Sequence, residues 1–180
     1  MKDFLILLFI FIFVNEINAM DLLNKKNIRS YYEKLEFISD EVMGGKSTGD
    51  VKVISSKNEN FIRLKGLVST ENNGGFIQFR SNYDFTNNEY KGIKITAKGQ
   101  VSEYYIHIRT NFLLLPWQYY SGKFEVDDKW KEIRILFSDF KKSNFYQPSE
   151  FDSSEIKSIG FVAYGKDFDA ELDLLEAELF

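Results

Sequence analysis

The chain has 180 residues, a formal net charge of −4 and no cysteine. The missing cysteines exclude disulfides, zinc–thiolate sites, a thiol nucleophile and lipid attachment to sulfur, and the acidic balance argues against general nucleic-acid binding, which needs clustered lysine and arginine. A chain of this length is expected to form one domain with its own core, and an aromatic content of 17% favours β-strands.

Residues 1–19 have the layout of a secretory signal peptide. Lys2 precedes eleven consecutive apolar residues, Phe4 to Val14, and Ala19 stands where a small residue is accepted before cleavage. A membrane-spanning helix would need about 20 apolar residues. We therefore expect an exported, periplasmic protein with no transmembrane span after signal removal. The alternatives are an uncleaved anchor, or a start of translation at Met20 that would leave the protein cytoplasmic or membrane-associated.

The rest of the chain is expected to fold as one unit. Residues 20–34 form an N-terminal lead-in, with a short helix or an extended segment over Asp21 to Lys34, and residues 35–180 form a single β-sandwich domain. Other helix is expected as single turns, at Phe137 to Lys142 and at Pro148 to Glu155.

A glycine-rich loop follows the lead-in at Ser39 to Gly49. Three glycines in six positions stand next to Asp40 and Glu41, so the backbone has free φ angles and exposed N–H groups. The loop is either a strained turn with a bulge before the first long strand or a segment that wraps a ligand. In the second case Asp40, Gly44 and Gly45 are the candidate contacting residues.

From Ser47 onward, apolar and polar residues alternate with a period of two, which is typical of half-buried antiparallel strands. The run Glu103 to Asn111 illustrates the pattern: one face carries Tyr104, Ile106 and Ile108, and the other carries Tyr105, His107 and Arg109. The pattern and the turns between the runs predict an all-β sandwich or barrel of about nine strands. The nine runs are Asp50 to Ile54, Phe61 to Val68, Gly75 to Arg80, Gly92 to Gly99, Glu103 to Asn111, Tyr120 to Val126, Glu132 to Phe137, Ile156 to Tyr164 and Ala170 to Leu179.

A second glycine-containing loop lies at Ser69 to Phe76. Its Asn-Gly pair is a strong turn signal before a strand. The functional alternative is that Asn72 and Asn73, together with Glu71, offer hydrogen bonds or oxygen ligands to a hard cation. The fixed carboxylates are too few for that ligand set, so no metal and no cofactor are expected.

The stretch from Glu103 to Tyr120 contains the single histidine of the chain, His107, beside Arg109. One histidine without a legible partner indicates a solvated or hydrogen-bonded side chain rather than a catalytic one. The following run around Pro116 is apolar and joins two strands. An exposed apolar loop of this kind often marks a binding site for a partner or a ligand. Its aromatic residues either stack on sugar rings or close the end of the sandwich; they are Trp117, Tyr119 and Tyr120.

Seven spaced segments carry a family resemblance that covers residues 35–180. They are Ser39 to Ser47, Val68 to Phe76, Tyr90 to Ile93, Ile108 to Thr110, Trp130 to Ile133, Phe137 to Phe140 and Ile156 to Gly160. In order and spacing they resemble the complex I intermediate-associated protein 30 family. The sequence departs from the family pattern at Ser143 to Tyr146, where many members have an Arg-Gly-Arg segment, and near Leu35 or Phe37, where many have a tryptophan.

The resemblance implies a galactose-binding-like, antiparallel jelly-roll β-sandwich. It also implies a non-catalytic factor that holds assembly intermediates of a respiratory NADH dehydrogenase, and it supplies no catalytic residues. This role and the signal peptide point to different compartments, because the peripheral arm of complex I is built on the cytoplasmic or matrix side of its membrane.

Three functional hypotheses follow. The first is a binding domain that holds a protein partner, such as a complex I intermediate, through the two Gly-Gly loops and the Pro116-Trp117 loop. The second is a periplasmic carbohydrate-binding module with Trp117, Tyr119 and Tyr120 as stacking surfaces and Arg109, Asn72 and Asn73 as polar contacts. The third is a glycan hydrolase, which would need two carboxylates about 5 to 9.5 Å apart across a cleft. The candidates for that pair are Asp40, Glu41, Glu71 and Glu103.

Overall fold

The computed structural model of the chain describes residues 19–56, 59–86 and 89–180. The expected signal peptide falls on residues 1–19, and of these all but the last lie outside the described residues. Within the described ranges, no helix has the length and apolar character to cross a membrane.

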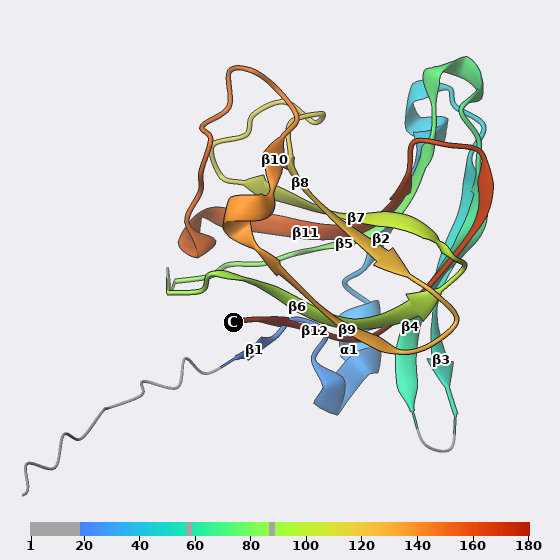
Figure 1. The fold of residues 1–180 in the computed structure, drawn as a ribbon, viewed down its shortest axis with the longest axis horizontal. Helices are drawn as coiled ribbons and strands as arrows, with labels where there is room; N and C mark the ends of the chain where they lie inside the picture. Colours follow the sequence, from blue (N-terminus) through green and yellow to red (C-terminus); the bar gives the residue numbers. More distant parts are fainter. Residues whose placement is uncertain (1–18, 57–58, 87–88) are drawn as a thin grey trace, which may run out of the picture.

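The described chain folds into two antiparallel sheets packed face to face, and the second sheet lies above the first in Figure 1. The first sheet has the order β3 (Thr48–Ser55), β4 (Asn60–Val68), β12 (Phe168–Leu179), β6 (Gly92–Gly99) and β9 (Lys131–Leu136), and β1 (Met20–Asp21) adds to β12. The second sheet has the order β10 (Lys141–Lys142), β8 (Tyr120–Val126), β7 (Ser102–Thr110), β11 (Ile156–Tyr164), β5 (Phe76–Asn82) and β2 (Glu36–Ser39).

This architecture confirms the all-β, jelly-roll sandwich class. The nine expected strands correspond to β3 to β9, β11 and β12, but the number nine is wrong, because the described residues form twelve strands. The three additional strands, β1, β2 and β10, have two to four residues each. Strands this short show no alternation of their own, and they exist because a neighbouring edge offers backbone hydrogen bonds.

Helix is limited to short pieces, as expected. The α-helix α1 (Ile28–Tyr32) follows the 3₁₀ turn η1 (Lys25–Asn27), and the Asn27 side chain caps α1 by accepting a hydrogen bond from Ser30 N–H. The other 3₁₀ turns are η2 (Asp40–Met43), η3 (Glu71–Asn73), η4 (Phe137–Asp139) and η5 (Ser153–Glu155). The lead-in packs on the sandwich, because Leu22, Leu23 and Tyr31 are buried in the core.

The core lies between the inner faces of the two sheets. Alternate residues of β7 point into it, so Tyr104, Ile106 and Ile108 are fully buried. Phe79 of β5 and Phe161 of β11 stack with ring centroids 5.2 Å apart. The face assignment made from the period of two therefore holds for β7.

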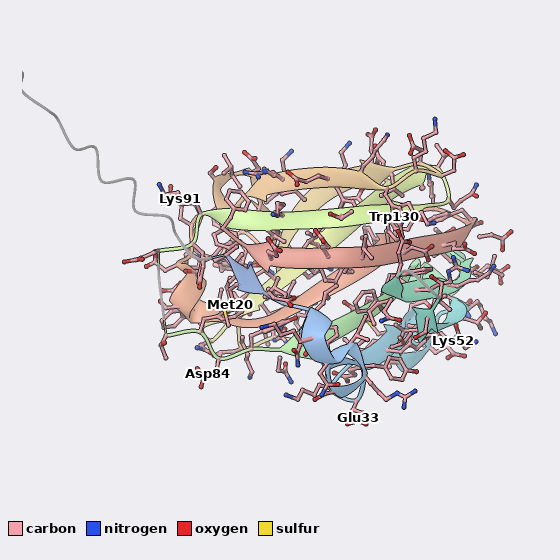
Figure 2. All side chains as sticks on the ribbon, turned by 90° about the horizontal axis from the view of Figure 1, so that it is seen from below. Met20, Glu33, Lys52, Asp84, Lys91 and Trp130 are labelled. Atoms are coloured by element: carbon pink, nitrogen blue, oxygen red, sulfur yellow. The ribbon has the colours of Figure 1, made fainter. Side chains whose placement is uncertain are left out.

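The two outer faces differ. The first sheet carries cross-strand ion pairs on its outer face, including a bidentate Arg63–Asp173 pair with distances of 2.6 and 2.7 Å. Figure 2 views this face and labels Trp130; Lys98 Nζ lies 4.5 Å from the centroid of that ring. On the second sheet, the outward residues Ser158, Gly160 and Val162 of β11 are buried as well. β11 is therefore covered on both faces, and its outward residues Ser158 and Gly160 line a hollow on the outer side of the second sheet.

Candidate functional site

The hollow is a groove of about 950 Å³ on the outer face of the second sheet. Its floor is formed by β2, β5, β11 and β7. One wall is formed by Glu41, Val42 and Met43 of η2, and the other by Pro116 and Trp117 from the β7–β8 connection. In Figure 1, the β7–β8 connection lies at the upper left and the loops that contain η2 and η3 lie at the upper right, on either side of the outer face of the second sheet.

Aromatic side chains form a cluster on one side of the groove. The His107 ring stacks on Tyr119, with centroids 3.9 Å apart and planes 15° apart. Tyr164 meets the edge of this stack, 6.2 Å from His107. Trp117 is 60% exposed, so its ring is free to contact a ligand. Burial lowers the pKa of His107 to about 3, and the imidazole in the groove is therefore neutral at ordinary pH.

Polar side chains lie on the groove floor beside these rings. Arg80 of β5 donates from Nε and Nη2 to Oε2 of Glu36 at 2.8 Å. Gln78 is the outward residue that precedes Arg80 in β5, and its side chain lies next to Gly160 of β11. A Cβ on Gly160 would stand 3.0 Å from Gln78 Oε1, so the glycine leaves room for the amide to lie across the floor.

Arg109 links the floor to the Trp117 wall. Its Nη2 donates to the carbonyl oxygens of Leu113 at 3.2 Å and Leu115 at 3.1 Å, whereas its Nε is buried without a hydrogen-bond partner. Burial, with a smaller contribution from the charge of Arg80, lowers the pKa of Arg109. The guanidinium holds the loop by its backbone, and no carboxylate is paired with it in the part of the chain that the structure describes.

The two Gly-Gly loops converge on the Asp40 carboxylate, which is completely buried. Its Oδ1 accepts from Ser47 N–H at 2.8 Å, and its Oδ2 accepts from Ser47 Oγ and from Gly75 N–H, both at 2.5 Å. A Cβ at Gly45 or Gly74 would stand 2.3 or 2.4 Å from atoms of this carboxyl group. The glycines are therefore required so that both loops can close around Asp40.

The ionisation of Asp40 depends on a balance of two effects. Burial alone would raise the pKa of this carboxyl group, but hydrogen bonds from Ser47, Gly75 and Phe76 outweigh it and hold the pKa below its usual range. The buried Asp40 carboxylate, bound by these donors, therefore connects the two loops and is not accessible to a ligand.

The structure separates the nine predicted site residues into three groups. Four of them line the groove: Asn73, Arg109, Trp117 and Tyr119. Four belong to the loop junction: Asp40 and Gly45 are buried in it, and Asn72 Nδ2 donates to the carbonyl oxygen of Gly44 at 3.1 Å. Tyr120 lies in the core, where its hydroxyl donates to the carbonyl oxygen of Pro148 at 3.1 Å.

Sequence reasoning missed most of the groove floor. Phe76, Gln78, Arg80, Ser158, Gly160 and Tyr164 all line it, whereas the sequence alone placed them only within the expected strands Gly75 to Arg80 and Ile156 to Tyr164. One local signal was present, because residues 159–163 form the unbroken run Ile-Gly-Phe-Val-Ala. A strand without polar residues on either face is buried on both faces, and this run marks the centre of the groove.

A second hollow, of about 400 Å³, lies on the outer face of the first sheet. Several of its charged residues are engaged in ion pairs, as Arg63 pairs with Asp173 and Glu171, and Lys65 pairs with Glu171. Among the described residues, no three histidine, aspartate or glutamate side chains gather as metal ligands. The groove is therefore the better candidate for ligand binding.

Comparison with known families gives one match. The model of the family described as complex I intermediate-associated protein 30 matches residues 24–174. None of the curated protein sequences compared with this chain matches it.

Several solved structures share the fold. A family 11 carbohydrate-binding module of a cellulosomal cellulase of Clostridium thermocellum superposes with a TM-score of 0.65 at 20% identity, covering 82% of this chain and 87% of that one. A family 11 module of the same organism, in complex with a β-1,3-1,4-mixed-linked tetrasaccharide, gives 0.64 at 20% identity, with coverages of 82% and 88%. An agarase gives 0.59 at 12% identity; the match covers 89% of this chain and 24% of the agarase.

Proposed function

Because this chain belongs to the complex I intermediate-associated protein 30 family and its second sheet carries a long groove lined by aromatic rings, we propose that it is a non-catalytic binding domain whose groove holds a carbohydrate chain. The observation that carries this proposal is that aromatic rings and planar polar side chains lie side by side in the lining of one groove. Ligand sites combine such apolar surfaces with a few fixed polar groups.

The chemistry of a sugar chain suits this lining. A pyranose ring has an apolar C–H face, which packs on aromatic rings such as those of Trp117 and Tyr164. Its edge carries hydroxyl groups, which both donate and accept hydrogen bonds. Gln78 offers a donor and an acceptor, and the Arg80–Glu36 pair offers charged donors and acceptors beside it.

The disposition of carboxylates supports binding without catalysis. Of the four carboxylates named above as candidates for a hydrolytic pair, only Glu41 lines the groove, because Asp40 is enclosed by the loops and Glu71 is not part of the lining. Glu103 accepts from Lys123 Nζ at 2.9 Å outside the groove. Glu36, on the floor, is held by Arg80. One of the family 11 modules with this fold is in complex with a mixed-linked tetrasaccharide, which makes that oligosaccharide a rational first probe.

The test is isothermal titration calorimetry of the chain from Met20 with the mixed-linked tetrasaccharide and with agarose oligosaccharides. Trp117→Ala should weaken binding at least about ten-fold, which corresponds to about 1.4 kcal/mol. Gly160→Leu should abolish binding, because its side chain would fill the centre of the floor. Its Cβ would stand 3.0 Å from the flexible Gln78 amide oxygen and 3.3 Å from Arg80 Cβ, so both neighbours would have to move by a few tenths of an ångström.

The matched control is Phe145→Ser, which changes an exposed aromatic residue outside the groove lining and should leave the affinity unchanged. Failure of wild type to bind any oligosaccharide, or equal affinity of wild type and Gly160→Leu, would contradict the glycan assignment.

The second candidate follows the family and is a segment of a protein partner, such as a complex I assembly intermediate, in the same groove. The specific observation in its favour is the apolar wall at Val42 and Met43, which are 74% and 66% exposed and offer nothing to sugar hydroxyls. Affinity capture from detergent-solubilised respiratory membranes should then retain complex I subunits with wild type and lose them with Gly160→Leu. Equal recovery with both proteins would rule out the groove as the partner site.

A further inference from the structure

The charged side chains of the groove are unevenly placed. Among the described residues, its lining has four with a formal charge: Glu36, Glu41, Arg80 and Arg109. Glu36 lies in β2, and Glu41 lies in η2, which follows β2 directly. Arg109 lies near the end of β7, on the side of the Trp117 wall. The groove therefore has its carboxylates on one side and a guanidinium group on the other.

The order of the strands keeps Arg109 apart from these carboxylates. β5 and β11 lie between β2 and β7, so the backbones of β2 and β7 are about 14 Å apart at the usual spacing of about 4.8 Å per strand. Glu36 stands opposite Arg80 in the ladder and binds it at 2.8 Å. Glu41 Oε2 accepts from Ser39 Oγ at 3.2 Å. Both carboxylates thus have partners on their own side, and the charge of Arg109 is left without a counter-charge.

The Arg109 guanidinium has donors to spare. Of its five N–H groups, the two on Nη2 are used by the carbonyl oxygens of Leu113 and Leu115, and the one on Nε is buried without a partner. The two N–H groups of Nη1 remain as donors for a ligand. Burial and the charge of Arg80 both lower the pKa of Arg109, which means that its surroundings oppose its positive charge. An anion in the groove would relieve both effects, since buried charges are normally paired.

The neighbours of Arg109 suit one sugar unit. Ser158 of β11 stands opposite Arg109 in the ladder and also lines the groove, so its hydroxyl group is a second donor beside the guanidinium. Trp117 and Tyr119 line the same side and offer aromatic ring faces to the apolar face of a sugar. Ring faces and the donors for an anion therefore lie together on this side of the groove.

We propose that the groove selects acidic oligosaccharides, with the carboxylate of a uronic acid unit bound by Arg109 and Ser158. This selectivity rests on the carbohydrate binding proposed above and adds the class of sugar. Arg109 then has two roles, because Nη2 anchors the Trp117 loop and Nη1 contacts the ligand. Hydrogen bonds between a guanidinium and a carboxylate are about twice as strong as those between neutral groups, so a sugar acid gains more here than a neutral sugar does.

The experiment is isothermal titration calorimetry of the chain from Met20 with cellotetraose and with the β-1,4-linked tetramer of glucuronic acid. These two oligosaccharides have the same linkage and differ in having a hydroxymethyl group or a carboxylate on each ring. An ionic strength of about 0.15 M limits the effect of the distant acidic residues, because the screening length is then about 8 Å. Wild type should bind tetraglucuronate about ten-fold more tightly than cellotetraose. The uncharged methyl ester of tetraglucuronate should bind as cellotetraose does.

The matched variants are Ser158→Asp and Ser158→Asn. Their side chains have nearly the same shape, but only the aspartate places a carboxylate beside Arg109 from within the protein. Any steric loss of affinity is common to both, so the ratio of the affinities for the two oligosaccharides is the readout. Ser158→Asn should keep the preference for tetraglucuronate, and Ser158→Asp should lose it. Arg109→Gln should lose it as well, whether or not the looser Trp117 loop weakens the binding of both oligosaccharides.

Equal affinity of wild type for cellotetraose and tetraglucuronate would overturn the acidic selectivity and leave carbohydrate binding intact. Failure to bind any oligosaccharide would contradict the proposed function itself, so the two failures are distinguishable. The same preference in Ser158→Asp and Ser158→Asn would rule out Arg109 as the carboxylate contact. Binding of tetraglutamate without binding of tetraglucuronate would also overturn the proposal, because it would identify an acidic peptide segment as the ligand.

Discussion

At the residue scale, Asp40 determines how the two Gly-Gly loops lie against each other. Its carboxylate is shielded from water and accepts from backbone and side-chain donors of both loops. Hydrogen bonds to a buried charge contribute more than those to neutral groups, and a buried donor left without an acceptor costs its full desolvation energy. The motif that looked like a ligand loop in the sequence is therefore a connector that positions one groove wall.

Replacing Asp40 by asparagine should destabilise the protein by about 2 to 3 kcal/mol. The amide would present hydrogen-bond donors where Asp40 accepts from Ser47 and Gly75, so at least one buried N–H would lose its acceptor. Urea unfolding at neutral pH measures the change in free energy of unfolding.

The matched control is Asp167→Asn. Asp167 accepts from Thr70 N–H and Oγ of the same loop, at 2.6 and 2.8 Å, but it is exposed. Its replacement should have a much smaller effect than that of Asp40. Similar losses in the free energy of unfolding for both variants would show that the contribution of Asp40 to stability does not depend on its burial.

His107 gives the protein a pH dependence of stability. Its pKa is about 3 in the folded chain and about 6.5 in the unfolded chain. Between these values the unfolded chain takes up a proton that the folded chain does not, so the free energy of unfolding should fall as the pH drops from about 6.5 towards about 3.

His107→Phe should flatten this dependence while keeping the stack on Tyr119. Urea unfolding of wild type and variant across this pH window measures it, and the difference between the two removes the contribution of the carboxylates. Asp40 affects the pH dependence only at lower pH. Its pKa is lower in the folded chain than in the unfolded chain, so the stability that it contributes is lost only as the pH falls below about 3.8 and through the pKa of the folded state. Parallel pH profiles for wild type and His107→Phe would be inconsistent with a partly buried imidazole that stays neutral in the folded chain.

At the element scale, local alternation identifies a strand only where the strand is long enough to show two faces. β7, with nine residues, alternates in the sequence as it does in burial. β1 and β10 have two residues each, and each lies on the edge of a longer partner, β12 and β8. Their strand conformation depends on hydrogen bonds from residues distant in the sequence, which no local pattern contains.

The small strand β1 is expected to contribute strongly to stability. Met20 and Asp21 pair with Leu179 and Glu178 of β12, and Leu22 and Leu23 beyond them are almost fully buried. A chain that begins at Asn24 should be less stable than one that begins at Met20 by at least about 3 kcal/mol, since a buried leucine is worth about 2 to 5 kcal/mol.

Thermal and urea unfolding of the two truncated chains measure this difference. The double variant Leu22→Ala, Leu23→Ala in the longer chain separates the packing of the side chains from the pairing of β1. Equal stability of all three proteins would show that the segment merely rests on the sandwich.

At the scale of the whole molecule, the groove arises because four strands of the second sheet and the loops beside them meet around it. The period of two placed His107 and Arg109 on an outer face, as found. It could not show that this face is concave, or that Gln78, Gly160 and Tyr164 from other strands would stand beside them. The candidate site was therefore half predicted: Asn73, Arg109, Trp117 and Tyr119 were identified by residue type and loop position, and the floor was not.

The sequence by itself determined the all-β class, the two faces of β7 and the family, because alternation and motif spacing are local properties of the chain. The tertiary structure decided which residues face a ligand. Asp40 and Gly75 are 35 positions apart, and their contact turns a predicted ligand loop into a structural junction. Tyr120 and Tyr119 are neighbours in sequence, but the pleat sends one into the core and the other into the groove. The physical reason is that the curvature of a sheet and the meeting of distant loops are set by packing between sheets.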